Sequence, residues 1–120
     1  MKILVADDDL DQLTLRCLLL QKSGFETIQA SDPKMALAAA RSENPKCAVL
    51  DLRFPTEESG FRLVRELKEL NSAMHLFLLT GANPARFAHR SEADLVDEIL
   101  EKGSPSAKLV RKLKAIERHK

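Results

Sequence analysis

The length, composition and charge of this chain indicate a single globular domain. Its 120 residues, 44% hydrophobic and 31% charged, exclude a disordered chain, and we expect one domain over residues 1–120. No apolar run approaches the ~20 residues that a membrane helix needs, and the chain begins with a strand-like run rather than a signal peptide. We therefore expect a cytoplasmic protein, with Cys17 and Cys47 as reduced core thiols.

The net charge is only +1, but it is unevenly distributed. Residues 1–60 carry 7 basic and 10 acidic side chains, whereas residues 61–120 carry 12 and 8. We interpret the basic surplus near the C-terminus as the solvated face of a last helix, and attraction of an acidic partner or nucleic acid is the alternative. Because the chain has no Trp or Tyr to stack on bases, we expect no nucleic-acid binding by this domain alone.

In the first half of the chain, apolar runs alternate with stretches of helical periodicity. A strand is predicted over residues 2–6 and a helix over 10–22, capped by Asp9 and stopped by Gly24 in a left-handed conformation. A weaker strand follows over 26–29. Asp32 then caps a helix that has Pro33 in its first turn and that ends before Pro45.

The second half continues the same alternation. Strands are predicted over 47–50, 75–79 and 98–100, and a helix after the first of these begins past Gly60. That helix has an apolar side made of Phe61, Val64, Leu67 and Leu70. Pro84 is expected to open a fourth helix, and the final helix runs from about Pro105 with Leu109, Val110, Leu113 and Ile116 facing inward.

This order of elements predicts an α/β fold of five strand–helix units. Strands separated by helices are parallel, and right-handed crossovers place helices on both faces of the sheet. The natural arrangement is a flavodoxin-like (βα)₅ three-layer sandwich with strand order 2-1-3-4-5. Its switch point, where such folds bind their ligands, lies between the first and third strands.

Polar residues stand where four of these strands end. Asp7 and Asp8 close the first strand, Asp51 closes the third, Thr80 closes the fourth, and Lys102 follows the fifth. Because the carboxyl ends of parallel strands share one edge, we expect these side chains to meet in one crevice. Clustered carboxylates repel each other unless a cation relieves them, so the sequence predicts a Mg²⁺ site, and the lysine beside it predicts a phosphoryl group.

The set of motifs resembles the receiver domains of two-component response regulators, in the single-domain form of chemotaxis regulators. The resemblance covers the whole chain, and the gaps between Asp8, Asp51, Thr80 and Lys102 are close to those usual for receivers. The matching stretches are residues 3–9 (ILVADDD), 49–52 (VLDL) with Pro55 and Gly60, 79–81 (LTG), and Lys102.

The resemblance implies a metal-assisted phosphoryl transfer. Asp51 would be the phosphoacceptor, taking the group from a sensor histidine kinase, a phosphotransfer protein or a small phosphodonor. Asp7 and Asp8 would hold Mg²⁺ together with Asp51 and the backbone carbonyl of Arg53. Thr80 would donate a hydrogen bond to a phosphoryl oxygen.

Lys102 would pair first with Asp51 and then with the phosphoryl group. The implied function is a signalling switch that catalyses its own phosphorylation and loses the group by hydrolysis, rather than a conventional turnover enzyme. No organic cofactor is implied. Output would pass to another, unknown protein, or to a homodimer, through the face formed by the fourth helix, the fifth strand and the last helix. No effector domain is predicted in the chain, and a fragment of a larger regulator is the alternative.

Three positions depart from the usual receiver pattern. Gly103 stands where a cis-proline commonly follows the site lysine, and we expect a looser hold on Lys102. Ile99 stands where an aromatic ring often changes orientation, which predicts a muted or different switch near Phe87. Arg53 stands two residues after the phosphoacceptor, where we expect it to tune the lifetime of the phosphoryl group.

Two other functions fit parts of this pattern. A pseudo-receiver, which acts as a phosphorylation-independent interaction module, is favoured by Gly103 and Ile99 but opposed by the complete set of site residues. A hydrolase with an aspartyl-phosphate intermediate needs a second aspartate shortly after the nucleophile, and Arg53 occupies the nearest position. Our leading prediction is therefore the phosphorylation-dependent switch.

Overall fold

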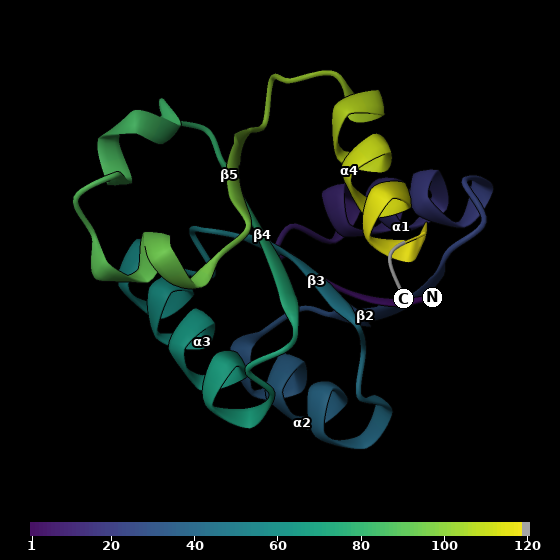
Figure 1. The fold of residues 1–120 in the computed structure, drawn as a ribbon, viewed down its shortest axis with the longest axis horizontal. Helices are drawn as coiled ribbons and strands as arrows, with labels where there is room; N and C mark the ends of the chain where they lie inside the picture. The colour runs from purple at the N-terminus through teal and green to yellow at the C-terminus, as the bar shows by residue number, and fades with distance from the viewer. Residues whose placement is uncertain (119–120) are drawn as a thin grey trace.

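A computed structural model describes residues 1–118 as a central parallel sheet between two layers of helices (Figure 1). His119 and Lys120, which the charge pattern includes, lie outside the described residues. The elements in chain order are β1 (Lys2–Ala6), α1 (Leu10–Lys22), β2 (Glu26–Ala30), α2 (Pro33–Glu43), β3 (Cys47–Asp51), α3 (Glu57–Leu70), β4 (His75–Thr80), η1 (Pro84–Phe87), η2 (Ser91–Leu95), β5 (Glu98–Glu101) and α4 (Ser106–Arg118).

The sheet has the strand order β2-β1-β3-β4-β5, and every neighbouring pair is parallel. This confirms the flavodoxin-like arrangement predicted from the alternation of strands and helices. Ala6 pairs with Leu50 and Asp51 pairs with Leu79, so the ends of β1, β3 and β4 lie level at one edge. The residues that follow these strands are therefore brought to one place.

The sheet buries an apolar cluster on each of its two faces. Alternate residues of each strand point to opposite faces, so neighbours such as Leu4 and Val5 belong to different clusters. The α2 and α3 helices cover one cluster, and α1 and α4 cover the other (Figure 1). Both cysteines are buried free thiols in the cluster under α1 and α4, as predicted.

The predicted helix signals act as expected in the first half of the chain. The Asp9 carboxylate accepts hydrogen bonds from the amides of Asp11 and Gln12 at the start of α1, and Asp32 caps α2 with Pro33 in its first turn. Gly24 has a φ of 96°, which is the left-handed conformation predicted for it after α1. These caps satisfy amides that have no partner within the helix.

The prediction that α3 begins past Gly60 is wrong. The helix begins at Glu57, because Thr56 and Ser59 form a reciprocal capping box that starts it earlier. Gly60 therefore lies inside the first turn, where a Cβ atom would stand 1.8 Å from the carbonyl oxygen of Leu52. Leu70, expected on the apolar side, is 42% exposed at the last turn of the helix.

The segment between β4 and β5 contains two short 3₁₀ helices, η1 and η2, instead of the predicted fourth helix. Its buried side chains, Phe87 and Glu92, are five residues apart, a spacing that does not fall on one face of an α-helix. Asn83 caps η1 through the amide of Ala85, and Pro84 opens it.

The remaining differences concern the ends of elements. The β2, β3, β4 and β5 strands each extend one residue further than predicted, and α4 begins at Ser106 rather than Pro105. Along residues 1–118, none of the helices combines the length and apolar character that crossing a membrane requires.

Candidate functional site

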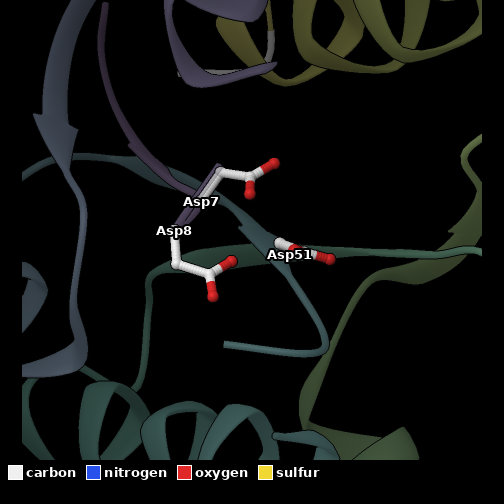
Figure 2. Close-up of side chains that lie close together, drawn as sticks. All are labelled: Asp7, Asp8 and Asp51. Atoms are coloured by element: carbon white, nitrogen blue, oxygen red, sulfur yellow. The ribbon is translucent and has the colours of Figure 1, made fainter. Parts of the chain in front are cut away.

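Three carboxylates meet at the carboxyl edge of the sheet. Asp7 and Asp8 follow β1 and Asp51 ends β3, and Figure 2 shows Asp7 and Asp8 directing their carboxylates to different sides of the chain, with Asp51 beside them. One oxygen from each of the three residues lies within 4.8 Å of the others. Asp7 and Asp51 are buried and Asp8 is exposed, so the cluster opens to solvent on the side of Asp8.

Asp7 is fully buried, and both of its oxygens accept hydrogen bonds. Oδ1 accepts from the amide of Asp9 at 2.9 Å, and Oδ2 accepts from Nη1 of Arg16 at 3.0 Å. Arg16 comes from the middle of α1, and only 11% of its side chain is exposed. The deepest carboxylate of the cluster therefore has a cationic partner built into the fold.

Asp51 has its own cation. The Nζ atom of Lys102 lies 3.1 Å from Oδ1 of Asp51. Burial raises the pKa of Asp51, and the negative charge of Asp7 raises it further. Lys102 lowers the pKa, but the effect of burial is larger, so the pKa of Asp51 lies above its usual value. The amide of Lys102 donates to the carbonyl of Thr80 at 2.7 Å, which places the lysine at this edge.

Thr80 ends β4 at the same edge and is buried. Its Oγ1 accepts a hydrogen bond from the amide of Ala82 at 3.0 Å, so the hydroxyl proton remains available to a ligand. A cavity of about 530 Å³ joins these groups. It is lined by Asp8, Asp9, Asp51, Leu52, Arg53, Pro55, Glu57, Thr80, Gly81, Ala82, Arg86 and Lys102.

The donor set fits a Mg²⁺ ion. Mg²⁺ prefers about six oxygen ligands at ~2.1 Å, so two opposite ligands stand ~4.2 Å apart. One oxygen from each of Asp7, Asp8 and Asp51 lies within 4.8 Å of the others, so small movements of the side chains bring all three to one ion. Few protein oxygens are needed, because Mg²⁺ retains several waters and also binds phosphate oxygens.

The three positions that depart from the usual receiver pattern have different surroundings. Arg53 is exposed and lines the cavity. Ile99 is half-buried and packs against the cluster covered by α2 and α3. Gly103 is exposed with open space around it, since a Cβ atom there would meet nothing within 4 Å. The looser hold on Lys102 that Gly103 is expected to give stays a prediction.

Three residues near the site were missed by the sequence reasoning. Arg16 binds Asp7, and Arg86 and Glu57 line the cavity while pairing with each other at 3.5 Å. For Arg16 there was a signal, because it falls at i+3 from Leu13 and beside Cys17, at the buried edge of α1. A charge at such a position needs a partner.

Ion pairs of the buried Glu92 with two partly exposed arginines dock the segment between β4 and β5 on α3. The Glu92 carboxylate pairs with the guanidinium groups of Arg65 and Arg90. Arg90 also binds Glu58 at 2.7 Å and lies 4.1 Å over the ring of Phe61. These contacts fix the chain that leaves Thr80, where the fourth helix was predicted.

Nearly all of the chain matches the model of a known protein family. Residues 3–114 match the response regulator receiver domain. The chain belongs to the response regulator receiver domain family. Its members are the phosphorylation-controlled switches of two-component signalling, which accept a phosphoryl group from histidine kinases, and this confirms the function predicted from the motifs.

Curated relatives of the receiver are longer transcription regulators. The alkaline phosphatase synthesis regulator PhoP of Bacillus subtilis is 35% identical over 80 residues, which cover 67% of this chain and 33% of PhoP. The regulator PrrA of Mycobacterium tuberculosis is 29% identical over 119 residues, which cover 99% of this chain and 51% of PrrA. The receiver thus spans between a third and a half of these two proteins.

Solved structures of other receivers share the fold. The TrrA protein of Thermotoga maritima, crystallised with Mg²⁺ and BeF, is 26% identical with a TM-score of 0.84, over 95% of this chain and 96% of that one. A receiver domain from Clostridium thermocellum is 28% identical with the same TM-score of 0.84, over 98% and 95% of the two chains. These matches extend the likeness from the motifs to the complete three-layer architecture.

Proposed function

We propose that this receiver accepts a phosphoryl group on Asp51 in a Mg²⁺-dependent reaction. The observation that supports this most strongly is the convergence of Asp7, Asp8 and Asp51 at one edge with Lys102 bound to Asp51. Three carboxylates at this distance need a cation, and an ammonium beside the acceptor suits a phosphoryl group. The TrrA structure contains Mg²⁺ and BeF, and we propose that Asp7, Asp8 and Asp51 hold Mg²⁺ beside a phosphoryl group in a comparable way.

Each residue has a defined task in this reaction. An oxygen of Asp51 bonds to phosphorus while the bond from phosphorus to the donor nitrogen or oxygen breaks, and the leaving group keeps the electron pair. Lys102 offsets charge on the phosphoryl oxygens, and the free proton of Thr80 hydrogen-bonds to one of them. The three aspartates and the backbone carbonyl of Arg53 would hold Mg²⁺, which would supply positive charge beside the phosphoryl oxygens.

The partner that supplies the phosphoryl group is a sensor histidine kinase or a histidine phosphotransfer protein. The downstream partner would read the face made by the segment 84–96, β5 and α4, which is also the candidate face for a homodimer. That face differs from the predicted one, because η1 and η2 stand in place of a regular helix. An aliphatic Ile99 in β5 implies a switch that does not depend on a swinging ring.

Intact mass after incubation with acetyl phosphate tests the proposal. With Mg²⁺ present we expect the mass to increase by one phosphoryl group, because Asp51 is a carboxylate nucleophile beside two cations. Without Mg²⁺, and in Asp51→Asn with Mg²⁺, we expect no increase.

A folded chain that shows no Mg²⁺-dependent phosphorylation would contradict the proposal and favour a pseudo-receiver. Circular dichroism of both proteins serves as the control for folding. Phosphorylation that persists in Asp51→Asn would assign the acceptor to another residue.

A further inference from the structure

The Arg16 side chain lies at the metal cluster, and the phosphoryl-transfer scheme gives it no task. It leaves the middle of α1, and its guanidinium reaches Asp7 through Nη1 at 3.0 Å. With 11% of the side chain exposed, the guanidinium is largely removed from water. A cation placed in this way interacts with the whole cluster and not only with its own partner, because screening by solvent is weak there.

Arg16 and Lys102 together leave the cluster with little excess negative charge. Arg16 binds Asp7 and Lys102 binds Asp51, so two of the three carboxylates have a cation before any metal arrives. Lys102 is partly exposed, with 35% of its side chain accessible, and it can move to a phosphoryl group. Arg16 is held to Asp7 by a hydrogen bond and is far less exposed than Lys102, so its charge stays beside the cluster when a metal ion binds.

We propose that Arg16 is a positioning residue that orients Asp7 and weakens Mg²⁺ binding, so that it sets the Mg²⁺ concentration at which the switch becomes competent. This inference rests on the proposed function, because it assigns a regulatory task at the same metal site. Oδ1 and Oδ2 of Asp7 each retain a lone pair after accepting from Asp9 and Arg16, so Asp7 can still bind the ion.

Removal of the positive charge of Arg16 has two opposing consequences. Without Mg²⁺, loss of Arg16 leaves Asp7 buried and unpaired, which destabilises the fold. With Mg²⁺, the ion no longer meets a fixed positive charge in a poorly screened site, and it compensates Asp7 in place of Arg16. A residue that only holds α1 against the sheet would cause the first effect without the second.

Isothermal titration calorimetry with MgCl₂, without any phosphodonor, measures the proposed effect directly. Arg16→Met replaces the guanidinium by an apolar side chain of similar length, and we expect it to bind Mg²⁺ about tenfold more tightly than the unmodified chain, ~1.4 kcal/mol in binding free energy. Arg62→Met removes an exposed arginine of α3 as a matched control, and we expect unchanged affinity.

Thermal unfolding in EDTA and in saturating MgCl₂ supplies the second readout. We expect Arg16→Met to unfold at a lower temperature than the parent in EDTA, and the difference to shrink in MgCl₂ because tighter binding stabilises the folded state. If Arg16→Met does not fold in EDTA, Arg16→Gln keeps one donor to Asp7 without the charge and is measured in the same way.

Equal or weaker Mg²⁺ binding by the folded variant, with the same loss of thermal stability in both buffers, would overturn the inference and make Arg16 a structural residue. Absence of Mg²⁺ binding by every variant would also overturn it. The proposed function fails separately, through the phosphorylation of Asp51. A tenfold tighter site on a chain that acetyl phosphate does not modify would support the inference alone.

Discussion

In the proposed reaction, Asp51, Lys102 and Thr80 transfer the phosphoryl group, and Arg53 tunes how long it is retained. Asp51, Lys102 and Thr80 are buried or tied to the edge of the sheet, whereas Arg53 is exposed and lines the cavity from the loop after β3. A guanidinium in that position can pair with phosphoryl oxygens and obstruct the approach of water. The sequence shows that Arg53 stands two residues after the acceptor, and the structure adds that its side chain is exposed and lines the cavity.

We expect Arg53→Ala to lose the phosphoryl group several-fold faster than the parent chain. The reason is that the substitution removes both a cation and a bulky side chain from the cavity beside Asp51. The measurement is the decay of the phosphorylated mass after removal of acetyl phosphate, with Arg62→Ala as the control for loss of an exposed arginine. Equal or slower decay in Arg53→Ala would contradict this role.

At the scale of elements, the first turn of α3 packs directly against the backbone of Leu52, the residue that follows the acceptor. The first turn of the helix touches Leu52 at Gly60, and the capping box of Thr56 and Ser59 fixes where the helix starts. Sequence periodicity identified the apolar side of α3 but placed Gly60 before the helix, because glycine is usually a poor interior residue. Close backbone contact explains why glycine is needed inside the turn.

Gly60→Ala is therefore expected to destabilise the fold by ~2 kcal/mol. Overpacking against a backbone carbonyl at 1.8 Å outweighs the gain of ~1 kcal/mol in helix propensity. Urea unfolding followed by circular dichroism measures the change. Gly103→Ala, which adds a methyl group to open space, is the matched control and should fall within ~0.5 kcal/mol of the parent. A neutral or stabilising Gly60→Ala would refute the close-contact argument.

The segment between β4 and β5 is held by charge and ring contacts where a helix was expected. Glu92 is buried and pairs with Arg65 and Arg90, and Phe87 packs its ring 5.7 Å from that of Phe61. Burial raises the pKa of Glu92, but hydrogen bonds from its own amide, Arg90 and Arg65 outweigh burial and lower it overall. The ionised carboxylate therefore contributes to folding stability.

We expect Glu92→Gln to cost ~1–2 kcal/mol of stability at pH 7, since charge-assisted bonds to two partly exposed arginines are lost. Because the pKa of Glu92 is lower in the folded state than in the unfolded state, its ionised carboxylate stabilises the fold at pH values above the unfolded pKa of ~4.3. This stability is lost as the pH falls through the folded-state pKa. The gap between parent and variant should therefore narrow below about pH 4.

Urea unfolding at several pH values measures this gap. Asp94→Asn, at an exposed carboxylate of η2, is the control and should show little effect. A gap of constant size from pH 7 to pH 3 would show that the charge of Glu92 is not what holds the segment.

At the scale of the whole molecule, the fold was predictable because its signals are local and repeated. Alternating strand and helix periods, caps at Asp9 and Asp32, and polar residues at strand ends together fix the order of the sheet and the edge of the site. The contact of Arg16 with Asp7 and the docking of Glu92 were not predictable, because they depend on which helix side chains reach across to other elements. The only trace of such a contact in the sequence is a charged residue at a helix position that is expected to be buried.

The three-layer architecture places both thiols of the protein on one side of the sheet. Cys17 and Cys47 are closed off from solvent in the cluster under α1 and α4, and burial raises the pKa of Cys47 to about 12. Native thiols of this kind react with alkylating reagents only when their surroundings open. The rate at which the two thiols are alkylated therefore reports how often the cluster under α1 and α4 opens. The chain has no tryptophan or tyrosine to report this opening by fluorescence, and neither of its two cysteines lies in the cluster on the opposite face.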